Sequence, residues 1–174
     1  YLFAGCAVSS MGVLVIMVTV LRKAGYLKNV VTLEHYHLMG KLMHAFVIFW
    51  AYIAFSQYFL VWYANITEET KFYLTRNTEF WNTFTIMCLV VGHFFIPFVI
   101  LLVRKVKMMP VVLSAIAVWN LLMHFCDIYW IIIPERGPSL SAAAGADIQM
   151  TIPGAWLFDL LAFISVAGIF GYFL

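Results

Sequence analysis

The feature that most constrains this chain is the apolar run from Val111 to Pro134, VVLSAIAVWNLLMHFCDIYWIIIP. It is long enough to cross a bilayer as one helix, yet it contains Asn120, His124 and Asp127. These residues stand at i, i+4 and i+7, so a helix places them in one polar stripe. An ionised Asp near the bilayer centre costs roughly 2.5–3.5 kcal/mol on insertion scales, so we expect the stripe to face partners from other spans.

The composition is that of an integral membrane protein. Of the 174 residues, 65% are hydrophobic and 10% are charged, whereas an ordinary soluble domain carries about 25% charged residues. Five apolar runs are each close to the ~20 residues that a spanning helix needs, and they cover residues 2–21, 42–62, 81–103, 108–133 and 155–174. The ten-residue alternating segments of a membrane β-barrel are absent from the sequence. We therefore predict an all-α, polytopic helical bundle that forms a single transmembrane domain.

Lys and Arg are unevenly distributed between the loops that connect these runs. The first and third loops together carry seven of them, namely Arg22, Lys23, Lys28, Lys41, Arg104, Lys105 and Lys107. The second and fourth loops carry three, namely Lys71, Arg76 and Arg136. By the positive-inside rule, the first and third loops face the cytoplasm.

The sequence lacks the motifs of a self-contained enzyme. Cys6, Cys88 and Cys126 lie in apolar runs and never at the spacing of metal ligands, so we predict neither a disulfide framework nor a metal site. No nucleophile–base triad, phosphate-binding loop or nucleic-acid-binding motif is present. We therefore assign no catalytic residue, metal or cofactor to this chain, and no nucleic-acid partner.

A second polar stripe precedes and enters the second apolar run. Thr32 is expected to cap a helix there, and the stripe stands at i, i+3, i+7 and i+10 of that helix. Its members are Glu34, His37, Lys41 and His44. One interpretation is an amphipathic lead-in whose charged side chains reach the headgroups. His44 is different, because it lies inside the apolar run and needs a partner or water.

His93 stands near the middle of the third run, and Pro97 follows it by four residues. Because Pro97 has no N–H to donate, an α-helix would leave the carbonyl of His93 unpaired, and a kink is expected. The basic turn at residues 104–107 is short, so the third and fourth spans should be antiparallel neighbours. His93 would then face the stripe on the fourth span, although a lone buried His is also explained by an ordinary interior hydrogen bond.

Asp159 lies near the start of the last apolar run. At a rise of ~1.5 Å per residue, Asp127 lies about 9 Å below Ile133 and Asp159 about 6 Å below Ala155, so the two carboxylates are predicted at similar depth. If they share a site, like-charge repulsion raises one pKa and the pair holds a proton. The alternative is that each carboxylate caps a neighbouring helix or pairs with another residue.

Together, the polar residues describe two files across the membrane. The outer file is Asp159, Asp127, His124 and Asn120, the inner file is Glu34, His37, Lys41 and His44, and His93 lies between them. Carboxylates and histidines exchange protons near neutral pH once burial has shifted their pKa values, so the pattern predicts two proton half-channels. Two alternatives stay open: a haem b held between His93 and His124, and a secondary transporter with broken helices.

Several long motifs are similar to one membrane-protein family. They are the run LEHYHLMGKLMHAFVIFWAYIAFSQYFLVWYANITEET at 33–70, NTEFW at 77–81, GHFFIPF at 92–98 and HFCDIYWIIIP at 124–134. They resemble the ActF membrane subunit of bacterial alternative complex III, which belongs with the NrfD/PsrC-like polytopic subunits. The chain begins and ends inside apolar runs, and we interpret it as a fragment that corresponds to the C-terminal half of such a subunit.

The resemblance implies a multi-pass protein of the bacterial inner membrane, in a quinol:electron-acceptor oxidoreductase of the respiratory chain. It implies that this chain carries no haem or iron–sulfur cluster and contributes proton half-channels and scaffolding. Quinol, the iron–sulfur clusters and haem c are expected on partners: an ActC-like membrane subunit, an iron–sulfur protein, and multihaem and monohaem cytochromes c. By motif, the family's proton-pathway positions carry over to Asp127, His124, His37, Lys41 and His44.

Overall fold

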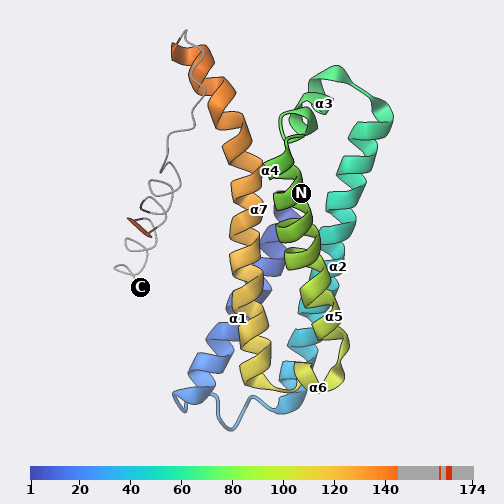
Figure 1. Cartoon of the computed structure of the whole chain (residues 1–174). Coiled ribbons are helices and arrows are strands. Elements are labelled where there is room, and N and C mark those ends of the chain that lie inside the picture. Colours follow the sequence, from blue (N-terminus) through green and yellow to red (C-terminus); the bar gives the residue numbers. More distant parts are fainter. Residues whose placement is uncertain (145–160, 162–163, 166–174) are drawn as a thin grey trace. The chain divides into compact units, whose positions relative to one another are not determined.

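The structure is a computed structural model that describes residues 1–144, 161 and 164–165. The chain divides into two units, Tyr1–Pro134 and Glu135–Leu174, and every regular element of the described residues is helical (Figure 1). The elements are α1 Leu2–Lys23, α2 Leu33–Ala64, α3 Thr67–Leu74, α4 Glu79–Phe84, the π-helix η1 Thr85–Phe95, α5 Ile96–Leu102, α6 Arg104–Lys107 and α7 Pro110–Ala144. The predicted all-α class is confirmed.

The described part of the chain contains four helical stretches long and apolar enough to cross a membrane, Leu2–Lys23, Leu33–Ala64, Glu79–Leu102 and Pro110–Pro134. The protein is therefore a multi-pass α-helical membrane protein whose surroundings are a lipid bilayer. These stretches correspond to the first four predicted runs. The fifth predicted run, 155–174, and Asp159 within it lie outside the described residues.

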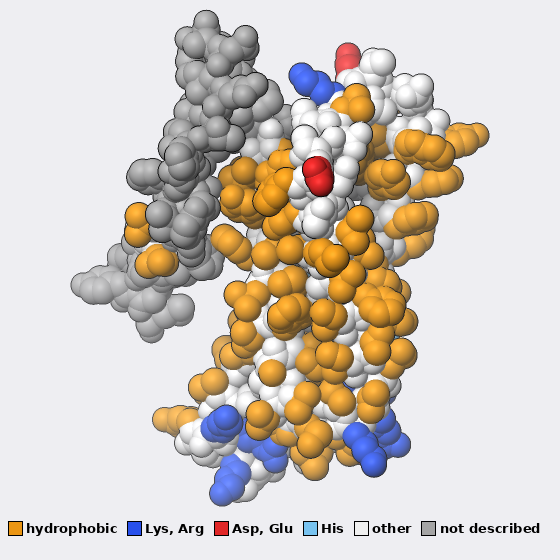
Figure 2. All heavy atoms as spheres, viewed as in Figure 1, with side chains coloured by type: hydrophobic (Ala, Val, Ile, Leu, Met, Phe, Trp, Pro, Cys, Tyr) orange, Lys and Arg blue, Asp and Glu red, His pale blue; other side chains and the backbone are white. Residues whose placement is uncertain are grey.

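Successive spans run up and down in the first unit (Figure 1). We call the end with residues 22–41 and α6 the basic end, and the opposite end, with α3, the α3 end. Figure 2 shows hydrophobic side chains over the middle of this unit and Lys and Arg gathered at the basic end. This distribution is typical of a helical bundle that exposes apolar side chains to lipid.

Helix α2 begins where the sequence predicts. Thr32 is the N-cap residue, and its backbone N–H donates to Nδ1 of His35 over 3.1 Å. The helix then continues without a break for 32 residues, so the lead-in and the second span are one element. It ends at Asn65, whose φ of 50° is left-handed, a conformation that Asn tolerates better than most residues. The short polar helix α3 follows at this end of the bundle.

The third span is wound as a π-helix from Thr85 to Phe95 before Pro97. In this winding the N–H of residue i bonds to the carbonyl of residue i−5, and Ile96 accordingly donates to the carbonyl of Val91. Pro97 would be the next donor, and the carbonyl that it leaves free is that of Gly92, where the sequence predicted His93. Nε1 of Trp119 on α7 donates to the Gly92 oxygen over 2.9 Å. A side chain from the neighbouring helix thus supplies the hydrogen bond that proline removes.

Replacing Trp119 by Phe is expected to destabilise the protein by about 0.5–1.5 kcal/mol, the range of one intramolecular hydrogen bond in water or in a membrane. The change keeps an aromatic ring and removes only the donor to Gly92. Trp62→Phe is the matched control, because Trp62 is 66% exposed. Thermal unfolding in detergent would measure the stability of both variants. In a Pro97→Ala background the restored N–H can reach Gly92, so an undiminished cost of Trp119→Phe there would contradict this account.

Glycines allow close contacts between neighbouring helices. A Cβ added at Gly12 of α1 would lie 3.2 Å from the carbonyl oxygen of Ala117 on α7, and nearby the Ser114 hydroxyl donates to the Thr19 hydroxyl over 3.0 Å. Small residues and hydroxyl hydrogen bonds hold membrane helices together in this way. Helix α7 is therefore packed directly on α1.

The apolar core has two parts. Toward the basic end lie Met11, Val15, Tyr36, Met43, Leu101, Leu113, Ile116 and Ala117. Toward the α3 end lie Ala4, Val8, Val47, Trp50, Leu89 and Trp130. Both parts draw residues from the helices of all four spans, so they fix the position of every side chain that lies between them.

Candidate functional site

Four buried polar residues lie in the middle of this core and form the buried polar cluster: His93, Asn120, His124 and Asp127. His93 comes from η1, and the other three form the predicted stripe on α7. Their exposed fractions are 0%, 0%, 8% and 1%. The expectation that the α7 stripe faces a packed interior is confirmed, because the stripe points toward neighbouring helices.

Asp127 is the best-partnered member of the cluster. The Tyr1 hydroxyl donates to Oδ1 of Asp127, and Nε1 of Trp50 donates to Oδ2 over 3.2 Å. His124 Nδ1 lies 3.8 Å from the same Oδ2, so the pair becomes a salt bridge whenever the imidazole is protonated. Neutral donors from two other helices therefore hold a titratable group that is buried in the membrane-spanning region.

His93 lies between Trp50 and His124. Its ring centroid is 4.0 Å from that of Trp50 and 6.1 Å from that of His124. The prediction that His93 faces the α7 stripe is therefore confirmed. Neither ring nitrogen of His93 has a hydrogen-bond partner within the described residues.

His124 owes its place to Gly5 of α1. A Cβ added at Gly5 would lie 2.4 Å from Cε1 of His124 and 2.8 Å from Nδ1. Real Cβ atoms do not come so close, so only glycine at this position lets the imidazole lie against the α1 backbone. Helix α1 is thus a wall of the buried polar cluster, a role that its apolar sequence did not indicate.

Three members of the cluster keep unused hydrogen-bonding atoms. Among the described residues, both side-chain atoms of Asn120, both ring nitrogens of His93 and Nδ1 of His124 lack hydrogen-bond partners. A buried polar group without a partner costs about 1–3 kcal/mol, and a functional role or a bound water or ion is the usual explanation for such a group. Imidazoles and a carboxylate at this spacing can accept, hold and pass a proton.

The inner file lies apart from this cluster. Glu34 and Lys41 are exposed, and His37 and His44 are half-buried; the His44 ring stacks on Phe98 at 5.2 Å. Along α2, the buried apolar residue Val47 separates His44 from Trp50. The structure therefore brings His93 to the outer file and leaves an apolar layer between it and the inner file.

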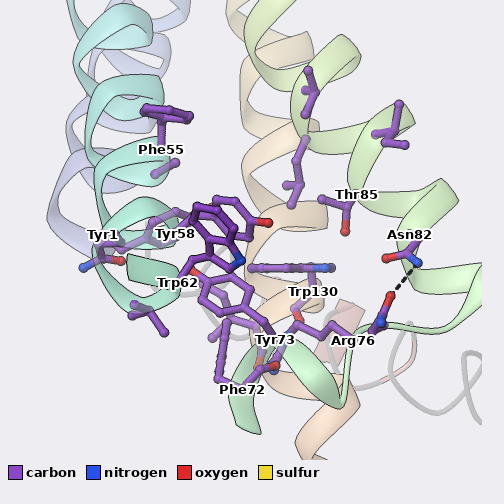
Figure 3. A pocket seen from close by; sticks show the side chains of 18 of the residues that line it. Tyr1, Phe55, Tyr58, Trp62, Phe72, Tyr73, Arg76, Asn82, Thr85 and Trp130 are labelled. Atoms are coloured by element: carbon purple, nitrogen blue, oxygen red, sulfur yellow. Dashed lines mark hydrogen bonds between the residues drawn. The ribbon is translucent and has the colours of Figure 1, made fainter. Parts of the chain in front are cut away.

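A cavity of about 1390 Å³ opens at the α3 end. Figure 3 shows aromatic rings from α2, α3 and α7 facing the same space, among them Tyr58, Phe72, Tyr73 and Trp130. Burial raises the pKa of the Tyr73 phenol, and Arg76 acts in the opposite direction. Tyr1 and Trp50, the two donors to Asp127, also line the cavity, so it reaches the first neighbours of the buried carboxylate.

Arg76 lines the cavity and contacts α7. In the sequence it was counted only as a charge of the second loop. It is 3% exposed. Nε donates to the carbonyl of Trp130 over 3.2 Å, and Nη2 donates to that of Ile131 over 2.7 Å. The guanidinium carbon lies 3.4 Å from the centroid of the Phe72 ring, a cation–π contact. Arg76 therefore ties the α3 end to the helix that carries Asp127.

Sequence reasoning missed Tyr1, Gly5 and Trp50 as parts of the site. Each lies within or beside an apolar run, where Tyr and Trp are ordinary interface residues and Gly an ordinary packing residue. The available signal was the stripe itself, because a buried Asp requires donors, and Trp50 is six residues after His44 on a span already expected to carry polar groups. Which donor meets Asp127 depends on helix rotation, which the pattern does not specify.

The chain matches no protein-family model and no curated protein. The features that bear on function are therefore the buried polar cluster, the cavity beside it and the membrane-spanning fold.

Proposed function

We propose that this chain is the proton-conducting membrane subunit of a quinol:electron-acceptor oxidoreductase of the alternative complex III kind, in the bacterial inner membrane. The observation that carries the proposal is Asp127, a carboxyl buried inside the fourth span and surrounded by two imidazoles, a phenol and an indole. A buried ionisable group in a membrane helix marks a proton or ion pathway by default.

The outer half of the route begins in the cavity at the α3 end. Tyr1 lines that cavity and donates to Asp127, so its hydroxyl lies between the cavity and the carboxylate. From Asp127 the proton passes to His124, 3.8 Å away, and then toward His93. Each of these groups has a protonated and an unprotonated form, which makes the file able to store one charge.

The inner half of the route is His37, Lys41 and His44, with Glu34 at its exposed end. Nδ1 of His37 and Nδ1 of His44 are buried without a hydrogen-bond partner in the described part of the chain. The apolar layer at Val47 separates the two halves, so proton transfer between them requires a conformational change of the helical bundle. Coupling that change to quinol turnover would prevent a passive leak.

The second element of the proposal is scaffolding. The helices expose many large apolar side chains along their length, which lipid or other membrane subunits can cover. We propose that an ActC-like subunit, an iron–sulfur protein and multihaem and monohaem cytochromes c bind this chain and carry the quinol site and the redox centres. The electrons then pass through the partner subunits and not through this chain, whose polar files move protons.

Purification of the tagged full-length protein in mild detergent tests the assignment. We expect haem c and iron–sulfur subunits to co-purify, and we expect the separated chain to show no haem in a reduced-minus-oxidised spectrum. A b-type band on the separated chain would make His93 and His124 ligands and overturn the proton account. Recovery of the chain alone and colourless would favour a secondary transporter, whose substrate would then stabilise the protein against heat.

A further inference from the structure

The buried charged residue that the proton route does not use is Lys107, on α6 at the basic end. Only 8% of this residue is exposed. Its side chain lies across α2 at Gly40, where an added Cβ would be 2.8 Å from Cγ and 3.0 Å from Cβ of Lys107. Glycine at position 40 thus creates a notch in α2 that holds the lysine stem.

The notch lies between two imidazoles. His37 is one turn before Gly40 and His44 one turn after it, and the charge of Lys107 acts on both. Lys41 and Arg104 also act on His37, as does Glu34 with the opposite sign. Donors and positive charges from α2 and α6 therefore surround one small region.

This region lacks a negative counterpart. No carboxylate of the described residues lies within ion-pair distance of Lys107, and Nδ1 of His37 and Nδ1 of His44 have no hydrogen-bond partner there. The whole basic end has seven Lys or Arg and a single acid, Glu34, in residues 22–41 and 104–107. The Lys107 amino group is not among the buried atoms that lack a partner, so the stem is buried in the notch while the charge reaches the protein surface, where an anion can contact it.

We propose that the Lys107 notch binds the phosphate of an anionic phospholipid from the adjoining leaflet. Phosphate oxygens accept from the Lys107 amino group, which gives this charge the negative counterpart that the described residues do not supply. The acyl chains continue along apolar side chains that are exposed directly before α6 in the chain, Leu102 and Val103. Basic pockets between transmembrane helices on the cytoplasmic side are known to hold anionic headgroups.

The lipid rather than free phosphate is proposed because of these exposed side chains. Leu102 and Val103 are exposed and directly precede α6, and apolar side chains cover the surface next to the basic end (Figure 2), so a headgroup reaches the notch without leaving the bilayer. The inference is independent of the proton proposal, since it concerns retention of a lipid and not the movement of a proton.

Native mass spectrometry of the full-length protein measures that retention. With phosphatidylglycerol or phosphatidylcholine added in detergent, we expect selective retention of phosphatidylglycerol. Lys107→Gln is expected to lower this selectivity about fivefold or more, the effect of one basic residue near an anionic surface. The matched control is Lys105→Gln, which removes an exposed charge from the same helix and should change selectivity little.

A second variant covers the case in which Lys107→Gln does not fold. Gly40→Ala keeps every charge but displaces the lysine stem, and it should also reduce retention of phosphatidylglycerol. Equal retention of the two lipids by the wild type, or equal losses in the Lys105 and Lys107 variants, would overturn the proposal. So would full displacement of the lipid by millimolar inorganic phosphate, because the site would then be one for a free anion.

Discussion

Replacing Asp127 by Asn is expected to leave the protein assembled with its partners and to lower proton movement coupled to quinol oxidation by about tenfold or more. Asn has nearly the shape of Asp and keeps one carbonyl oxygen, which can accept from one of the two donors, Tyr1 and Trp50, that bond to different oxygens of the Asp127 carboxylate. It cannot ionise, so it cannot hold the proton that passes toward His124. The measurement is the number of protons moved per quinol oxidised by the complex in sealed vesicles, beyond the two protons that oxidation of the quinol itself releases.

Glu68→Gln is the control for this change. It makes the same carboxylate-to-amide substitution on α3, where Glu68 is exposed, and it should leave proton release unchanged. An assembled Asp127→Asn complex with the proton stoichiometry of the wild type would contradict the proposed route. If this chain served only as a membrane anchor, Asp127→Asn would change the melting temperature of the protein and nothing else.

The fold and the position of the cluster were largely predictable because membrane insertion imposes strong constraints. Runs of about 20 apolar residues must be helices, and the short turn at residues 104–107 makes the last two spans described antiparallel neighbours. Given those two facts, a stripe of Asn120, His124 and Asp127 must turn away from lipid, and His93 is the polar residue at matching depth. This part of the prediction is confirmed by the ring contact between His93 and His124.

The details of the site depend on contacts that a one-dimensional pattern does not contain. Proline predicted an unpaired carbonyl, but whether it belonged to His93 or Gly92 depended on the α- or π-winding of the third span. With the π-winding, the free carbonyl is that of Gly92, which accepts a hydrogen bond from Trp119 on another helix. The sequence alone does not indicate this contact. Likewise, the rotation of α2 that brings Trp50 to Asp127 places His44 in the other half of the bundle. The sequence did not predict the apolar layer that separates His44 from His93, and Asp159 of the outer file lies outside the described residues.

Gly5 is the position where a minimal substitution should have a large effect on the cluster. At an open helical position Gly→Ala stabilises by roughly 0.5–1 kcal/mol. At Gly5 the new Cβ would meet Cε1 of His124 at 2.4 Å. The imidazole is buried between α1, His93 and Asp127, so it has little room to move away. We therefore expect Gly5→Ala to destabilise the protein by about 1–3 kcal/mol, the usual cost of overpacking a core.

A double-mutant cycle separates this clash from a general effect on α1. His124→Ala removes the ring that the new methyl group meets, so Gly5→Ala in that background should be neutral or stabilising, with a coupling energy of about 1–3 kcal/mol. Thermal unfolding in detergent measures the stability of the wild type, the two single variants and the double variant. Gly12→Ala is the comparison on the same helix face; its Cβ would meet the Ala117 oxygen at a milder 3.2 Å, and its effect should not depend on His124. Additive effects of the Gly5 and His124 substitutions would mean that α1 does not form the wall against which His124 is held beside Asp127.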